Sequence, residues 1–391
     1  MIKLGSVFMS EISRRNFFKL GASAALGAAL FNLETLPNTA LAKGNATKTL
    51  KFTPISIKNL PNAETAAKKS ELINTSLNYI KTCISKITDN NLRTKTASFI
   101  EDTRPTFMQM YPSSNDVTNI YNKLADENLL NTSIISPEQL FPSYNGQKPQ
   151  DFISGPGSGY SSHHPYPGGL CTHTAANLSI SEGIVNTYKQ VFGYEVDNNI
   201  VLSAQSLHDL AKPWVFQWNT DGTSFTEYTI AGTGAHHILS LVEAIHRNMP
   251  AEEIVAQACA HNHPGSPKDE EQVVSWIKAA SIIAQVNPIK YGLLDTSGTK
   301  IPYPQHQEGY IVHLGDHDWV LSSIVATKVV EALKEIAQKD YNFSTNDLNG
   351  KLFNDFRNYI GAQVSYMYLH NLLAQNGFGE LRSLINQIIV K

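Results

Sequence analysis

The sequence has 391 residues, with 31 Lys and Arg against 34 Asp and Glu, which gives a formal net charge of -3. Hydrophobic residues make up 42% of the chain, enough to bury a core, so the composition excludes a largely disordered protein. The nearly neutral charge argues against an extended nucleic-acid surface, which would need a clear basic excess. No apolar run reaches the roughly 18 to 20 residues that a membrane-spanning helix needs. The three cysteines are too few and too widely spaced for a disulfide framework.

Residues 1–42 are predicted to be an export signal. Adjacent arginines lie in residues 13–19 (SRRNFFK), an apolar stretch follows over 20–31, and Ala40-Leu41-Ala42 has the small residues of a signal-peptidase site. The segment resembles a twin-arginine signal peptide. That resemblance implies export by the twin-arginine translocon, cleavage after Ala42, a periplasmic or secreted protein, and no membrane span in the mature chain. An amphipathic N-terminal helix with an accidental arginine pair and an uncleaved anchor are the alternatives.

The first part of the mature chain is predicted to be a linker followed by helices. Residues 43–64 have no sustained period and are typical of a linker. Residues 65–150 form an N-terminal helical region, because apolar residues recur at helical spacing over 66–87, 99–110 and 117–130.

The predicted core covers residues 151–290, and a loop at 142–169 leads into it. This loop is rich in Pro, Gly, Ser, Tyr and His, and loops of this length often carry function. Aromatic and β-branched residues around Asp221-Gly222 predict a β-hairpin over 214–228. Helical periodicity is found in five core segments: 171–191, 198–211, 235–248, 251–260 and 271–284.

Residues 291–391 are predicted to be a C-terminal helical extension, with helices over 320–338 and 353–375. The expected fold class is therefore mainly α: a helical bundle with a small β-hairpin insertion and extra flanking helices.

Histidines gather in the predicted core at or near the ends of its helices. A single histidine is more often a structural residue than a ligand. Here the separations place one histidine on each successive helix, and Asp209 lies beside one of them. Ligands arranged in this way on facing helices are typical of metal sites in helical bundles, and imidazole with carboxylate suits a divalent transition metal. The candidate ligands are His173, His208, Asp209, His237 and His261.

Four stretches of the core resemble the HD-domain superfamily of metal-dependent phosphohydrolases. They are HHPYPGGLCTH at 163–173, LHDLAK at 207–212, YTIAGTGAHH at 228–237 and AHNHPGSP at 260–267. The resemblance implies an HD-type metal centre with one or two divalent ions, and Mn, Fe, Zn, Ni and Mg all remain open. It covers under half of the mature chain.

The resemblance also implies roles for individual residues. His173, His208 and Asp209 would hold one metal ion. A second ion would be held by His237 and His261, with His263 as a rival ligand. Asp209 would bridge the two ions and, with Lys212, form the catalytic pair. The substrate-binding candidates are His163, His164, Lys212, His236 and His263, with Tyr160 also at the entrance.

One departure from the family pattern concerns the last ligand. Family members close the site with an Asp on a later helix, but residues 281–287 read SIIAQVN, with Gln285 or Asn287 in the expected place. Asp316 or Asp318 could take its place from a loop, although Asp318 could equally be a helix cap.

The sequence thus predicts an exported metal-dependent phosphohydrolase acting on a small anionic phosphoester, either a monoester or a phosphodiester or nucleotide. Two alternatives stay open: an HD-type di-iron oxygenase, and a non-catalytic periplasmic metal- or ligand-binding protein with a degenerate site.

Overall fold

The structure is a computed structural model that describes residues 51–304 and 307–391. All of these residues belong to one compact unit, residues 37–391. The predicted signal peptide and residues 43–50 of the predicted linker lie outside the described residues. The described chain is mainly helical, and its named strands are only two residues long, which confirms the predicted fold class.

The first described elements are β1 (Ile55–Ser56), the 3-10 turn η4 (Ile57–Asn59) and helices α2 (Ala63–Lys69) and α3 (Glu71–Ser85). One helix over 66–87 was expected, and that prediction is wrong because Ser70 divides it. The Ser70 hydroxyl caps α3 by accepting from the Ile73 N–H at 3.1 Å, and it donates to the carbonyl of Ala362 at 2.6 Å.

The N-terminal region continues with α4 (Asn90–Glu101), η5 (Thr106–Met110) and α5 (Ser114–Asp126). The helix predicted over 99–110 is wrong, because α4 ends at Glu101 and a 3-10 turn follows Pro105. Asp89 begins α4 by accepting from the Leu92 N–H. The long loop over 142–169 is confirmed, and within it lies the 3-10 turn η7 (Phe152–Ser154); another, η6 (Pro137–Gln139), precedes it.

The five predicted core helices are present, with earlier or later ends. They are α6 (Gly169–Phe192), α7 (Asn198–Leu207), α9 (Ala235–His246), α10 (Ala251–Ala258) and α11 (Pro267–Ile283). The short helices α8 (Lys212–Val215) and α12 (Pro288–Tyr291) were not predicted. The hairpin predicted over 214–228 is reduced to one antiparallel bridge, between Trp218 and Ser224, because Trp214 belongs to α8. The named two-stranded sheet comes just after it, where β2 (Thr229–Ile230) pairs with β3 (Thr233–Gly234).

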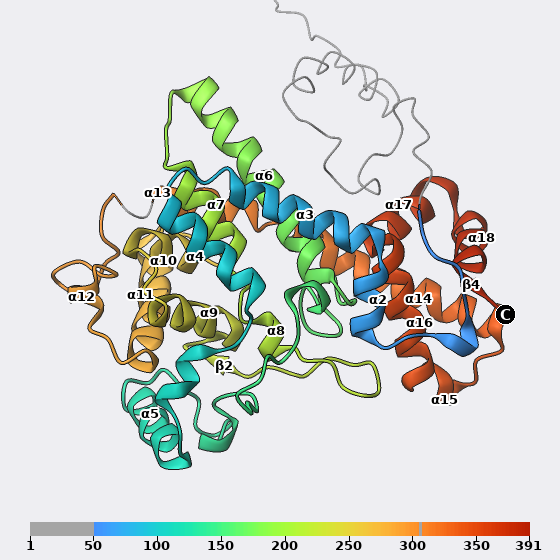
Figure 1. The fold of residues 1–391 in the computed structure, drawn as a ribbon, viewed down its shortest axis with the longest axis horizontal. Helices are drawn as coiled ribbons and strands as arrows, with labels where there is room; N and C mark the ends of the chain where they lie inside the picture. The colour runs from blue at the N-terminus through green and yellow to red at the C-terminus, as the bar shows by residue number, and fades with distance from the viewer. Residues whose placement is uncertain (1–50, 305–306) are drawn as a thin grey trace, which may run out of the picture. The chain divides into compact units, whose positions relative to one another are not determined.

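The C-terminal extension contains α13 (Gln307–Gly315), α14 (Trp319–Tyr341), α15 (Thr345–Leu348), α16 (Lys351–Val364), α17 (Tyr366–Asn376), α18 (Phe378–Ile388) and β4 (Ile389–Val390). Helices α13 and α18 were not predicted. The single helix expected over 353–375 is two helices, because Ser365 has a φ of 57° and interrupts the backbone. Parallel pairing of β4 with β1 brings the end of the chain beside the first described strand (Figure 1).

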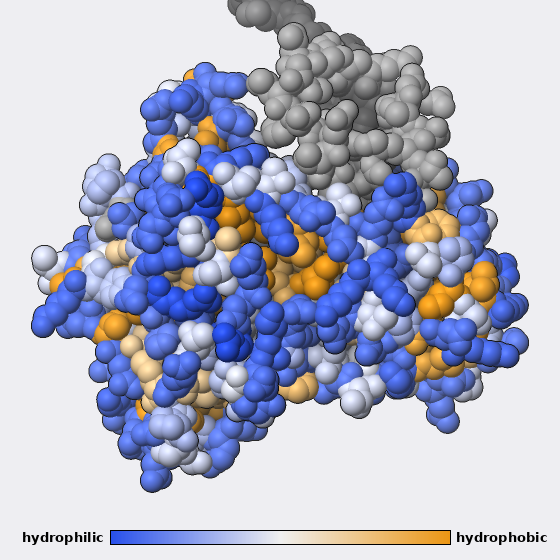
Figure 2. All heavy atoms as spheres, viewed as in Figure 1, coloured by the Kyte–Doolittle hydropathy of each residue, from blue (hydrophilic) through white to orange (hydrophobic). Residues whose placement is uncertain are grey.

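Helix α6 is central to the packing, because it contacts α3, α7 and α13, and α10 in turn packs against α7, α9 and α13 (Figure 1). Hydrophilic residues cover most of the face in Figure 2, and hydrophobic ones show in its middle and toward its right side. Among the described residues, none of the helices has the length and apolar character required to span a bilayer.

Candidate metal centre

His173 is placed by the tight loop that precedes α6. The backbone of Gly168 is left-handed, with φ 81°, and a Cβ on Gly169 would lie 1.9 Å from the carbonyl oxygen of His164. Two glycines are therefore needed for the loop to turn directly into the helix. His173 then lies in the second turn of α6, buried, with its ring directed into the bundle.

His208 and Asp209 reach the same place from α7. This helix was expected to continue to Ala211, but it ends at Leu207 with His208 as its C-cap. The Nδ1 of His208 contacts the carbonyl oxygen of Gln205 at 2.9 Å. Nδ1 must carry the proton in that contact, so the Nε2 of His208 faces the cluster, 3.4 Å from the Nε2 of His173. Because the helix stops there, His208 and its neighbour Asp209 can both face inward.

Asp316, directly after α13, supplies the acid that residues 281–287 lack. Its Oδ1 lies 3.0 Å from the Nε2 of His173 and 3.2 Å from the Nε2 of His208, and its Oδ2 lies 3.6 Å from the Nε2 of His261. Gln285 and Asn287 are exposed, and the Asn287 side chain instead caps α12. Of the four candidates that the sequence left open, Asp316 is therefore the one among the ligand atoms.

Asp318 supports the cluster from behind. It occupies the N-cap position of α14 but makes no side-chain capping hydrogen bond. Instead its Oδ1 lies 3.0 Å from the Nδ1 of His173, and its Oδ2 lies 2.7 Å from the Nε2 of His164. A carboxylate behind a ligand imidazole fixes the orientation of the ring and raises its basicity. Asp318 is thus better described as a partner of His173 than as a helix cap.

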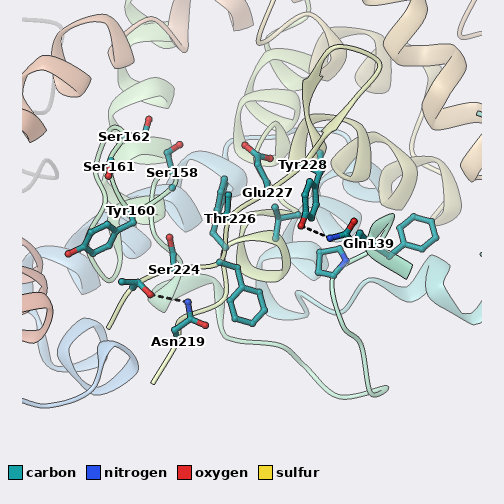
Figure 3. Close-up of a pocket in the computed structure, with 18 of the residues that line it drawn as sticks. Gln139, Ser158, Tyr160, Ser161, Ser162, Asn219, Ser224, Thr226, Glu227 and Tyr228 are labelled. Atoms are coloured by element: carbon teal, nitrogen blue, oxygen red, sulfur yellow. Dashed lines mark hydrogen bonds between the residues drawn. The ribbon is translucent and has the colours of Figure 1, made fainter. Parts of the chain in front are cut away.

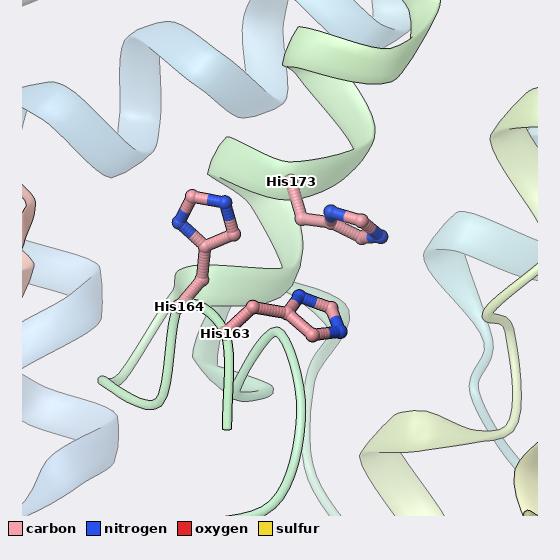
Figure 4. Close-up of side chains that lie close together, drawn as sticks. All are labelled: His163, His164 and His173. Atoms are coloured by element: carbon pink, nitrogen blue, oxygen red, sulfur yellow. The ribbon is translucent and has the colours of Figure 1, made fainter. Parts of the chain in front are cut away.

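The two predicted entrance histidines differ in position. The ring of His163 points the same way as that of His173, and their centroids are 4.7 Å apart, whereas His164 stands on the other side (Figure 4). Burial, with the charges of Lys212 and His173, lowers the pKa of His163 well below 6.5. Its Nδ1 is buried and has no hydrogen-bond partner among the described residues. His163 therefore presents a neutral ring beside the cluster.

Lys212 is a buried cation beside the cluster. Its Nζ lies 2.5 Å from the Oδ2 of Asp209 and also donates to the carbonyl of Gly157. Lysine is rarely buried without a partner, so this placement joins it to the predicted site.

A second group of imidazoles lies on the other side of Asp209. The Nε2 atoms of His236 and His261 are 3.4 and 3.5 Å from the Oδ1 of Asp209. His237, which the sequence favoured over His236, stacks on His261 with ring centroids 3.3 Å apart. Its Nδ1 contacts Thr233. Both histidines are therefore within the group, and His236 is the one with a nitrogen directed at Asp209.

Glu227 is a residue that the sequence did not single out. Its Oε2 lies 2.7 Å from the Nδ1 of His236, so Nδ1 carries the proton and Nε2 is left for Asp209 or an ion. Gly234 makes room for this carboxylate, because a Cβ there would lie 2.7 Å from Oε1. His263 has a different environment: its ring lies beside His313, with centroids 4.9 Å apart, outside the groups of converging ligand atoms.

Burial and neighbouring charges shift the pKa values of the groups in the cluster. Burial opposes protonation of His173, but Asp318, Asp209 and Asp316 outweigh burial and raise its pKa well above 6.5. The same balance, with Asp209 and Asp316, raises the pKa of His208 to about 9. Burial would raise the pKa of Asp209, but the charges of His208 and Lys212 hold it well below 3.8. Burial also dominates at His261, where it lowers the pKa to about 4. The carboxylates thus stay charged, and the His261 ring stays neutral.

The donor set fits divalent metal ions. Ligand atoms lie within 4.8 Å of one another in each of four groups that meet here: His163, His164 and His173; His173, His208 and Asp316; His208, Asp209 and His261; and His236, His237 and His261. Both Asp209 oxygens are buried without a properly oriented hydrogen bond among the described residues, although basic nitrogens surround them. Imidazole nitrogens with carboxylate oxygens are the ligands of Zn, Fe, Mn and Ni sites, and a cation would satisfy the Asp209 oxygens.

A cavity of about 980 Å³ adjoins this cluster. Its walls come from the loop at 158–162, from residues 139–142 and from the segment at 215–228 (Figure 3). Glu227 and Phe216 line it, and both contact His236, the Phe216 ring at a centroid distance of 5.4 Å. The histidines themselves are not among its lining residues, and Glu227 and Phe216 lie between the cavity and the His236 ring.

No family model and no solved structure matches the chain. The chain is similar to the dihydroneopterin 2',3'-cyclic phosphate phosphodiesterase of Methanocaldococcus jannaschii, with 29% identity over 115 residues. The match covers 29% of this chain and 45% of the relative, so the chain spans less than half of the relative's length. The name of this relative describes a phosphodiesterase, which supports the resemblance to phosphohydrolases seen in the motifs.

Proposed function

We propose that this protein is a metal-dependent phosphohydrolase of the HD type. The observation that carries the proposal is the convergence of His173, His208, Asp209 and Asp316, from three separate parts of the chain, on one buried point. The similarity to a phosphodiesterase supports the same reaction class.

The residues have distinct parts in this proposal. His173, His208, Asp209 and Asp316 would hold one ion, and His236 and His261, together with Asp209, would hold a second. Ions in such a ligand set supply Lewis acidity and make water a nucleophile near neutral pH.

Lys212 adds a fixed positive charge beside Asp209, where it offsets the negative charge that develops on the phosphoryl oxygens. Asp318 and Glu227 hold the rings of His173 and His236 so that their Nε2 atoms face Asp209. These carboxylates act by positioning the ligands and do not touch the substrate's phosphate.

We extend the proposal to the bond and the compartment. The name of the relative describes a cyclic phosphodiester, and we infer that a small phosphodiester of this kind is the substrate class, with phosphomonoesters next in order. The arginine pair Arg14-Arg15 supports export by the twin-arginine translocon and a periplasmic or secreted location.

The test uses the full chain purified after export from its own cells. Elemental analysis gives the metal content, and release of phosphate or alcohol is measured on cyclic phosphodiesters and phosphomonoesters with Mn, Fe, Zn, Ni or Mg. We expect metal-dependent turnover that His208→Ala abolishes together with metal binding. The matched control is His370→Ala, on α17 and away from the cluster, which keeps both.

Two results would contradict the proposal: a metal-loaded chain inert on the whole panel, or unchanged metal content in His208→Ala. Stoichiometric iron with oxygen consumption would favour the oxygenase alternative instead. For export, Arg14→Lys with Arg15→Lys is expected to retain the precursor inside the cell, and N-terminal sequencing of the exported chain is expected to begin at Lys43. Export of the lysine variant at the normal rate would contradict the twin-arginine route.

A further inference from the structure

The cavity next to the cluster has a composition of its own. It is lined mainly by hydroxyl, amide and aromatic side chains, and among its described lining residues Glu227 is the only charged one. Its volume of about 980 Å³ is at the upper end of what small-molecule sites occupy, roughly 300 to 1,000 Å³. A site without Lys or Arg in its walls is not suited to a second phosphate group.

Hydrogen-bonding groups are distributed over opposite walls. Ser158, Ser161 and Ser162 come from the loop that leads to the metal ligands, and Gln139 and Tyr228 stand across from them (Figure 3). The Gln139 Nε2 donates to the Tyr228 hydroxyl at 2.8 Å, which leaves the Tyr228 O–H to donate elsewhere.

Ser224 supplies a second oxygen atom next to the cavity. Ser224 lines the cavity, and its hydroxyl is buried and makes no hydrogen bond among the described residues. A buried hydroxyl without a partner is costly, and rotation of this side chain toward the cavity would let a ligand satisfy it. The Oε2 of Glu227 accepts from the backbone N–H of His236 and contacts its Nδ1, whereas Oε1 takes part in neither contact. Carboxylate and hydroxyl oxygens in this arrangement suit the hydroxyl groups of a polyol.

Aromatic rings supply the apolar surface. Phe141, Phe216 and Phe225 line the cavity, and Phe141 is held by stacking on the buried Trp214 at a centroid distance of 6.3 Å. Fixed aromatic faces favour planar rings in a ligand.

We infer that this cavity binds the alcohol half of the substrate: an uncharged, hydroxyl-bearing group with a planar ring, of about nucleoside size. The inference rests on the proposed function for the position of the phosphate, which lies at the metal cluster. The alcohol then extends past His236 and Glu227 into the cavity. Selectivity follows from the walls, because a neutral ring-bearing alcohol is accepted and a group with further phosphates is not.

The first experiment measures binding without catalysis. The full chain is stripped of metal with a chelator, and adenosine, guanosine, cytidine and uridine are titrated in by calorimetry or ligand-observed NMR. Thr226 lines the cavity and is exposed, so Thr226→Trp fills the space without touching the cluster. Thr229→Trp is the matched control, because Thr229 is also exposed but is not part of the lining. Ser161→Trp, on the opposite wall, is the second blocking variant.

We expect at least one nucleoside to bind. Both blocking variants are expected to raise its Kd by at least roughly tenfold, and the control to change it by less than about twofold. Absence of binding by every nucleoside, or equal Kd values in Thr226→Trp, Ser161→Trp and the unmodified chain, overturns the inference. Circular dichroism and thermal melting establish that the variants compared are folded.

The second experiment uses the metal-loaded chain with a nucleoside 2',3'-cyclic phosphate and with a phosphoester of glycerol. Thr226→Trp is expected to raise KM for the nucleoside ester at least roughly tenfold and to leave the glycerol ester unchanged. Equal effects on both esters contradict the cavity assignment. Hydrolysis without nucleoside binding would overturn the cavity while the proposed function stands. Cavity-dependent nucleoside binding without hydrolysis of any phosphoester would overturn the proposed function while the ligand class of the cavity stands.

Discussion

Replacement of Asp316 by asparagine is the sharpest test of the metal centre. The change removes one negative charge and keeps the size of the side chain. The carboxylate lies 3.0 to 3.6 Å from the Nε2 atoms of His173, His208 and His261, so it is the acid that joins both sides of the cluster. An amide oxygen in its place is uncharged and a weaker ligand.

The size of the effect follows from these distances. Two unit charges about 3.2 Å apart interact by roughly 5 kcal/mol at an effective dielectric constant of about 20. Burial of the carboxylate offsets part of this attraction, which leaves a net loss of about 2 to 4 kcal/mol. That corresponds to a rise of roughly 30- to 1,000-fold in the Kd for the ion.

The assay is a titration of the chelator-stripped full chain with Mn²⁺ or Zn²⁺ by calorimetry, together with elemental analysis after dialysis. The matched control is Gln285→Asn, which changes one of the two residues that could stand where the family pattern has an acid. Asparagine tolerates the φ of 56° found at Gln285. Unchanged affinity in Asp316→Asn, or a larger loss in Gln285→Asn, would refute the assignment of Asp316 as a ligand.

Three further predictions follow from the same contacts. Lys212→Gln is expected to lower kcat by roughly 100-fold or more while metal content is retained, since its Nζ lies beside Asp209; unchanged kcat would contradict its role. Removal of metal is expected to lower the melting temperature, and an ion at about 100 times its Kd to restore about 2.7 kcal/mol; equal melting curves with and without metal would count against a structural ion. Burial raises the pKa of Glu253 to about 8, so the folded chain keeps a proton there that the unfolded chain releases above pH 4.5, and stability is lost as pH rises from 4.5 to 8. Glu253→Gln is therefore expected to gain stability relative to the unmodified chain by on the order of 1 kcal/mol per pH unit between about pH 5 and 8, measured by urea unfolding with chelator present; a pH-independent difference would show that Glu253 is ionised in the fold.

Regular elements with a strong apolar period were predictable. Helices α6, α9 and α14 appear where the spacing placed them, because an amphipathic pattern marks the face that must be buried. The ends of helices were harder to predict. The apolar period continues across Ser70 and Ser365, yet each of these serines ends one helix and begins the next. Whether a serine caps one helix or continues another depends on what its hydroxyl meets, and Ser70 meets a carbonyl 292 residues away.

The site residues also divide into those that local sequence predicts and those that it does not. His173, His208 and Asp209 could be found because motif and spacing are local properties of the sequence. Glu227 carries no comparable signal, because it lies in an irregular segment nine residues before the His236 that it orients.

The sequence by itself determined the candidate metal ligands of this protein: which imidazoles are present, that an acid follows one of them, and that they lie in or near the ends of helices. Only the tertiary structure decided which acid completes the set. Asp316 lies 107 residues beyond Asp209, and the packing of α13 against α6 and α7 brings it to the histidines. A ligand's position depends on how helices pack, and packing is a property of side-chain surfaces distant in sequence, which no local pattern records.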